Sequence, residues 1–135
     1  MSLNSILAVG PTVQQDLLSL VTRFRTYQVA LTAGIAKMYR QVRMHDEDIN
    51  LQRILWRKDP SEPIQIYQLK TVTYGTSSAS FLATRCVLQL AAHEEHNFPH
   101  ASRLLRNNFY VDDLLGGAET VEEAIKLRQE LQLLL

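Results

Sequence analysis

The stretch FYVDDLLGG (109–117) places two adjacent acids, Asp112 and Asp113, between apolar residues. Aromatic and β-branched residues favour strands, and Asp is well tolerated in tight turns, so the segment predicts a β-hairpin over 108–117. Two interpretations of the acids stay open at this point. They are either ordinary turn residues, or ligands of a divalent cation that offsets the repulsion between neighbouring carboxylates.

Helical and strand patterns alternate along the rest of the chain. Thr12 and the apolar spacing after it predict a helix over 13–24, and Thr120 with Glu123 forms a capping-box pattern at the start of the last helix. The other expected elements are a strand at 27–33, strands in QRILW (52–56) and IQIYQLKTV (64–72), a helix from Ser77 or Ser78 to about 95, and a short helix near 100–106.

This order of elements predicts an α+β fold, with a small antiparallel sheet and helices packed on one of its faces. The length of 135 residues suits one domain or part of one. The last helix ends on the apolar sequence LQLLL (131–135). Either its packing partner lies outside this chain, or this end packs back on the same domain.

The charge balance weakens the case for a general nucleic-acid-binding function. The chain has 14 basic and 14 acidic residues, whereas a dedicated phosphate-binding protein usually has a basic excess. No apolar run approaches the roughly 18 residues that a membrane helix needs, and a polar segment follows Met1 instead of a signal peptide. We therefore expect an intracellular protein, in the cytoplasm or nucleus, with no membrane partner. Cys86 lies in an apolar helical pattern and is expected to be a core thiol.

Two further groups of residues have competing interpretations. His93, His96 and His100 could suggest a metal, but the first two are three residues apart instead of the four that a zinc helix needs, so a solvated helix end is favoured. Trp56 and Tyr67 could stack on nucleic-acid bases, but packing in the core is the favoured interpretation.

Several motifs together resemble a known family. FYVDD is similar to the aromatic-x-Asp-Asp motif of reverse transcriptases, and ALTAGIAKMYRQV (30–42) and TVTYGTSSASFLATR (71–85) precede it in the order of that family's earlier motifs. With LNSILAVGP, LLSLVTRFR, QRILW and VEEAI, the whole chain resembles the polymerase region of BEL/Pao-type retrotransposon polyproteins. The resemblance implies that residues 1–135 are a partial reverse-transcriptase domain. It would comprise the palm and part of the fingers, without thumb or RNase H.

The resemblance also implies a catalytic centre. In the family, two Mg²⁺ ions hold the primer hydroxyl and the incoming triphosphate, and carboxylates from two neighbouring strands bind the metals. Asp112 and Asp113 match the hairpin ligands. The remaining ligand of the family is an Asp at the position of Gly34. Because this acid is missing, we expect nucleotidyl transfer to be impaired by at least about 10²–10³ in rate.

Other residues are assigned through the same resemblance. Tyr39 matches the aromatic residue that packs under the nucleotide sugar, and Tyr74 and Gly75 match the start of the motif that contacts nucleotide and template. Tyr110 is expected near the primer end. The implied partners are a template–primer and a deoxynucleoside triphosphate. The alternative function is a retained non-catalytic palm module that binds nucleic acid, or a protein partner at its apolar C-terminus.

Overall fold

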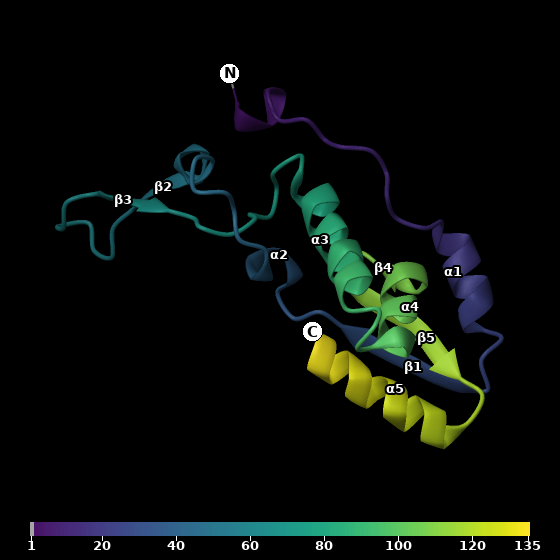
Figure 1. The fold of residues 1–135 in the computed structure, drawn as a ribbon. Helices are drawn as coiled ribbons and strands as arrows, with labels where there is room; N and C mark the ends of the chain where they lie inside the picture. The colour runs from purple at the N-terminus through teal and green to yellow at the C-terminus, as the bar shows by residue number, and fades with distance from the viewer. Residues whose placement is uncertain (1) are drawn as a thin grey trace. The chain divides into compact units, whose positions relative to one another are not determined.

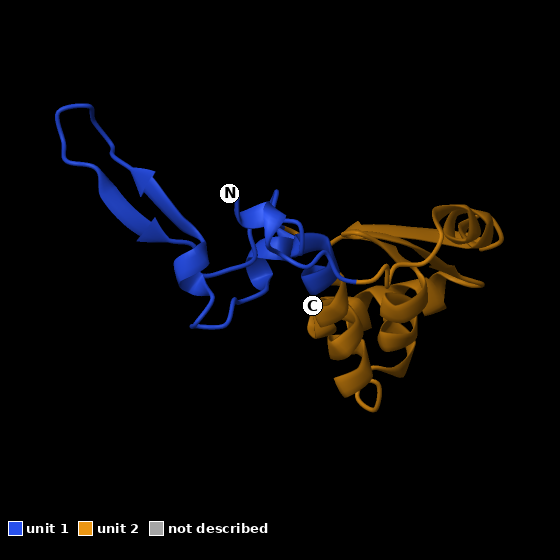
Figure 2. Cartoon of the chain, turned by 90° about the horizontal axis from the view of Figure 1, so that it is seen from above, with its two compact units in different colours: residues 1–10, 37–83 blue, residues 11–36, 84–135 orange. Residues whose placement is uncertain are grey.

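The computed structural model describes residues 2–135, which form two compact units (Figure 2). We call residues 1–10 and 37–83 the hairpin unit, and residues 11–36 and 84–135 the sheet unit. Each unit contains an antiparallel sheet of its own. The prediction of one common sheet is therefore wrong, whereas the predicted α+β class is confirmed.

The helices and strands follow closely the order that the sequence predicts (Figure 1). The helices are α1 (Leu17–Phe24), α2 (Met38–Gln41), α3 (Ala79–His93), α4 (Pro99–Asn107) and α5 (Val121–Leu134), with short 3-10 helices at Leu3–Ser5 and Ile49–Leu51. The strands are β1 (Val29–Gly34), β2 (Arg53–Trp56), β3 (Gln65–Gln68), β4 (Phe109–Tyr110) and β5 (Asp113–Ala118).

The sheet of the sheet unit has the strand order β1-β5-β4 (Figure 1). β1 runs antiparallel to β5 along its whole length, and the pairing ends with Gly34 opposite Asp113. β4 and β5 form the predicted hairpin, which closes with Tyr110 opposite Asp113. The register therefore brings the end of β1 beside the tip of the hairpin.

The core of the sheet unit lies on one face of this sheet. Side chains alternate along β5, so Leu114 and Gly116 are buried on this face while Asp113 is exposed. Residues of α3, α4 and α5 complete the core on this face: Ala91, Ala101, Leu104, Leu105, Leu127, Leu131 and Leu134. The apolar end of the chain thus packs back on its own unit through Leu131 and Leu134.

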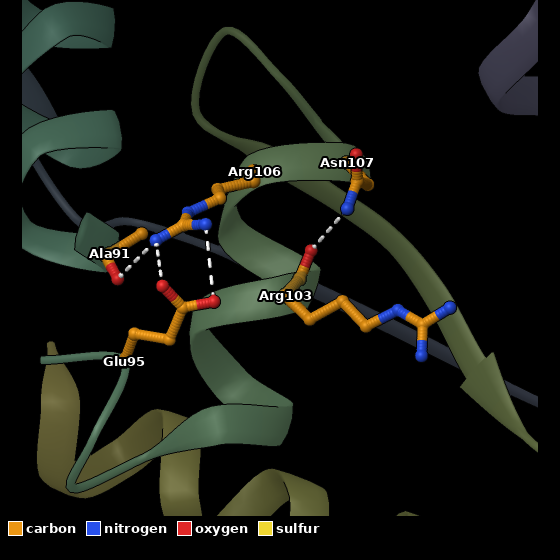
Figure 3. Close-up of polar contacts among 5 residues, drawn as sticks. All are labelled: Ala91, Glu95, Arg103, Arg106 and Asn107. Atoms are coloured by element: carbon orange, nitrogen blue, oxygen red, sulfur yellow. Dashed lines mark hydrogen bonds and ion pairs between the residues drawn. The ribbon is translucent and has the colours of Figure 1, made fainter.

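Polar contacts between residues that are close in sequence stabilise the helices of the sheet unit. The Arg106 guanidinium on α4 donates hydrogen bonds to both carboxylate oxygens of Glu95 and to the backbone oxygen of Ala91 on α3 (Figure 3). At the start of α5, Thr120 accepts from the backbone N–H of Glu123, whose side chain accepts from the backbone of Thr120. The predicted capping box is confirmed.

Helix α1 starts later than predicted. The structure places its N-cap at Asp16, four residues after Thr12, and Asp16 accepts hydrogen bonds from the backbone N–H and hydroxyl of Ser19. Asp satisfies the free N–H groups of a first turn better than Thr does. These two bonds, the backbone one first, also lower the pKa of the Asp16 carboxyl.

The prediction that Cys86 is a core thiol is wrong, because its side chain is exposed. In this part of α3 the residues that face the core are Val87, Leu90 and Ala91. Successive helical residues are about 100° apart around the axis, so Cys86 lies to one side of Val87. The apolar pattern of α3 is wide, and only part of it is covered.

The hairpin unit has a different character. β2 and β3 pair with each other from Arg53↔Gln68 to Trp56↔Gln65, and all eight residues of the two strands are exposed. The buried side chains of this unit lie elsewhere, at Met38, Ile49 and Val72 among others. Trp56 and Tyr67 are exposed, so the favoured interpretation that they pack in the core is wrong.

No helix within residues 2–135 has both the length and the apolar composition needed to cross a bilayer.

Candidate functional site

The tip of the β4–β5 hairpin is a two-residue turn, Val111–Asp112, between the paired residues Tyr110 and Asp113. Val111 has a backbone φ of 57°, in the left-handed region that β-branched residues rarely adopt. A positive φ at the first turn residue is what a two-residue hairpin requires, and glycine usually supplies it. Placing Val there costs of order 1–3 kcal/mol, and such strained residues cluster at functional sites.

Gly34 at the end of β1 lies beside both acids of the hairpin. It pairs with Asp113, and the backbone N–H of the next residue, Ile35, donates a hydrogen bond of 2.9 Å to the backbone oxygen of Asp112. A Cβ built on Gly34 would lie 3.6 Å from Oδ1 of Asp113, which is an ordinary contact distance. A side chain at position 34 would therefore fit, and it would start next to the Asp113 carboxylate.

The acids lie at an exposed end of the sheet. Ala30, Thr32 and Gly34 lie opposite Gly117, Leu115 and Asp113 respectively, on the sheet face that α3–α5 do not cover. Asp112, Asp113, Thr32 and Gly34 are all exposed. Within residues 2–135 neither carboxylate has a hydrogen-bond or ion-pair partner of its own. The structure thus presents two neighbouring, uncompensated negative charges at an accessible point.

The ligands present at the hairpin tip can be compared with those that a divalent cation needs. Mg²⁺ prefers one or two carboxylates together with substrate phosphates, and a two-metal centre needs carboxylates that bridge both ions. Asp112 and Asp113 supply hard oxygen ligands, but Gly34 offers only backbone. In the described part of the chain, no group of three His, Cys, Asp or Glu side chains lies close enough to hold an ion. The residues present are one carboxylate short of a two-metal set.

The nucleotide-contacting residues expected from the resemblance, Tyr39, Tyr74 and Gly75, belong to the hairpin unit. The rings of Tyr39 and Tyr74 meet edge to face, with 4.7 Å between their centroids. Gly75 has a φ of 84°, a value that favours glycine, and no atom lies within 4 Å of a Cβ built there. The two tyrosines therefore form one aromatic pair, and a left-handed turn precedes α3.

Asn4 holds this turn, a role for which there is no local signal in the sequence. Its side-chain amide donates to the backbone oxygen of Gly75 at 2.8 Å, and its Oδ1 accepts from the backbone N–H of Ser77 at 2.9 Å. Asn4 is more than 70 residues away in sequence, so no local pattern could have revealed the contact.

Two other features of the sheet unit carry several titratable side chains. His93, His96 and His100 are exposed around the junction of α3 and α4, as expected for a solvated helix end. A cavity of about 770 Å³ lies between α4, α5 and the end of β5. Two glutamates that line it already accept hydrogen bonds. Glu123 caps α5, and Glu130 accepts from the backbone N–H of Ala101. Neither feature brings together a reactive constellation.

No family model, no curated protein and no solved structure matches this chain.

Proposed function

We propose that this chain is the palm, with part of the fingers, of a BEL/Pao-type retrotransposon RNA-directed DNA polymerase whose catalytic centre has lost one carboxylate. The observation that supports this proposal best is the register of β1 on β5. It places Gly34, where the family motif has an acid, directly opposite Asp113 and beside Asp112. A polymerase palm brings its carboxylates together from two neighbouring strands in this way.

The proposed roles follow from these positions. Asp112 and Asp113 would hold Mg²⁺, which when bound supplies charge neutralisation for nucleotidyl transfer. Tyr39, Tyr74 and Gly75 would contact the nucleotide and template. Tyr110, next to the strained Val111, would lie near the primer end. With glycine at position 34 the metal ligands are incomplete, and we assign no catalytic step to this chain. Such a protein would work inside the cell.

The second candidate function is a retained module without catalysis, binding nucleic acid or a protein through the old palm surface. Glycine at position 34 favours it, because the β4–β5 hairpin forms and pairs with β1 although one metal ligand is missing. Leu133 and Leu135 remain exposed at the apolar C-terminus and are available to a protein partner.

A metal-binding experiment tests the proposed centre. Gly34→Asp should raise the affinity for Mn²⁺, a spectroscopic substitute for Mg²⁺, by about tenfold or more, because it adds a carboxylate beside Asp113. Thr32→Asp is the matched control, since it adds the same charge on the same face two residues away. It should leave the affinity within about twofold. Adding Asp113→Asn to Gly34→Asp should abolish the gain. Electron paramagnetic resonance of free Mn²⁺ measures all four proteins, and equal gains for both Asp variants would contradict the proposal.

A primer-extension assay with Mg²⁺ tests the impairment. The unaltered chain should give no more product than Asp112→Asn, because the centre lacks a ligand in both proteins. Synthesis that is robust in the unaltered chain and lost in Asp112→Asn would show that glycine at position 34 is tolerated.

A further inference from the structure

The β2–β3 hairpin exposes large apolar side chains that form no core. Trp56 and Tyr67 are 52% and 41% exposed, and Leu55 and Ile66 are 70% and 64% exposed. A two-stranded hairpin is only marginally stable by itself in water. Large apolar side chains gathered on an exposed surface often mark a binding site.

The register separates these residues into two different faces. Ile54 pairs with Tyr67 and Trp56 pairs with Gln65, so Trp56 and Tyr67 lie diagonally on one face, with 5.9 Å between their ring centroids. The Tyr67 hydroxyl donates to Oε1 of Gln65 on the same face. We call Ile54, Trp56, Gln65 and Tyr67 the aromatic face. The opposite face carries Leu55 and Ile66 and no aromatic ring.

Basic residues lie next to the aromatic face along the chain. Arg57 and Lys58 follow Trp56 at one end of the hairpin, and Lys70 lies at the other end, three residues after Tyr67. Within residues 2–135 none of these three forms an ion pair. The hairpin unit has seven basic and five acidic residues although the whole chain is neutral. One of its acids, Asp59, is occupied by the hydroxyl and backbone N–H of Ser61.

Aromatic rings for bases and unpaired cations for phosphates are what a single-stranded nucleic acid requires of a protein surface. We propose that the aromatic face of the β2–β3 hairpin binds single-stranded nucleic acid, with bases stacked on Trp56 and Tyr67 and the backbone held by the flanking cations. The ligand class agrees with the proposed function, but the site is separate from the hairpin acids. It needs neither a metal nor a carboxylate at position 34.

The chain contains one tryptophan, so Trp56 itself reports on the site. A deoxythymidine oligomer of about 15 nucleotides, added without metal at about 20 mM salt, should quench Trp56 emission in a saturable manner. The anisotropy of the labelled oligomer measures affinity in the variants. Trp56→Leu and Tyr67→Ala should each weaken binding by about 5- to 100-fold, because each removes a stacking surface.

Matched variants distinguish base stacking from non-specific apolar binding. Leu55→Ala removes an exposed apolar side chain of the same strand from the opposite face, and it should change affinity by less than about twofold. The double change Arg57→Gln with Lys58→Gln should lower the slope of log affinity against log salt by about 1.4, since each contact to a single strand contributes about 0.7. Far-UV circular dichroism confirms that each variant keeps its fold.

Three results would overturn the proposal. The first is no quenching and no binding at low salt. The second is an equal loss of affinity in Leu55→Ala and Trp56→Leu. The third is a change of Trp56 emission that follows protein concentration instead of oligomer concentration, which would show that the face binds a second copy of the chain. None of these results touches the Mn²⁺ affinity of Gly34→Asp, so this proposal and the proposed function fail independently.

Discussion

The two hairpins of this protein both contain strand-forming residues, but their surroundings are opposite. β4–β5 buries Leu114 and Gly116 under α4 and α5, whereas β2–β3 exposes all eight of its strand residues. Both contain aromatic and aliphatic residues that favour strands. The comparison teaches that such residues specify an extended, paired backbone, while burial requires a helix that packs on the resulting face.

A matched pair of leucine substitutions should give the largest difference between the hairpins. Leu114→Ala in β5 should lower the free energy of unfolding by about 3 kcal/mol, because it leaves a cavity at a side chain that is 1% exposed. Leu55→Ala in β2, where the side chain is 70% exposed, should change it by less than about 0.5 kcal/mol. Urea denaturation followed by circular dichroism measures both. Similar losses would show that β2–β3 is covered in solution and would break the comparison.

Weakening the helix that covers β5 should have an intermediate effect. Thr120→Ala removes the N-cap of α5 and should lower the free energy of unfolding by about 1 kcal/mol. Thr120→Ser retains a capping hydroxyl and serves as the control, with a smaller loss. The emission of Trp56 in the folded protein should be the same in both variants, since β2–β3 takes no support from this cap. A shift of that emission in Thr120→Ala would contradict the separation of the two hairpins.

The smallest expected effect concerns two exposed aspartates, one in each unit. Hydrogen bonds from Ser19 lower the pKa of Asp16, and hydrogen bonds from Ser61 lower the pKa of Asp59. A carboxyl whose pKa is lowered by folding stabilises the fold above its unfolded-state pKa, and this contribution is lost as the pH falls through the folded-state pKa. Asp16→Ala should therefore destabilise the protein slightly at neutral pH, and the difference should vanish in strong acid.

Asp59→Ala should have less effect than Asp16→Ala, because its loop joins strands that contribute no core. Urea midpoints at about pH 7 and about pH 2 measure both variants. Asp16→Asn keeps a capping oxygen that does not titrate, and it should show a weaker pH dependence. A difference between Asp16→Ala and the unaltered chain that is the same at both pH values would contradict this account.

The sequence predicted most elements and misplaced several side chains. The β4–β5 hairpin, β1 and the capping box of α5 are confirmed, because turn residues, alternation and caps act within a few residues of one another. The start of α1 was wrong, since Thr12 and Asp16 both suit a cap and only the observed first turn distinguishes them. The burial of Cys86, Trp56 and Tyr67 was wrong for a different reason. An apolar side chain shows that it can be buried, but not that another element covers it.

The sequence by itself determined where most of the helices and strands form, and where two adjacent acids meet a tight turn. It also determined that position 34 has no side chain. Only the tertiary structure decided that Gly34 lies opposite Asp113 and that the strands divide into two sheets with one covered and one open. The physical reason is range. Hydrogen bonds and steric limits within a few residues fix local structure, whereas pairing across nearly 80 residues and the burial of a face depend on how all the elements pack.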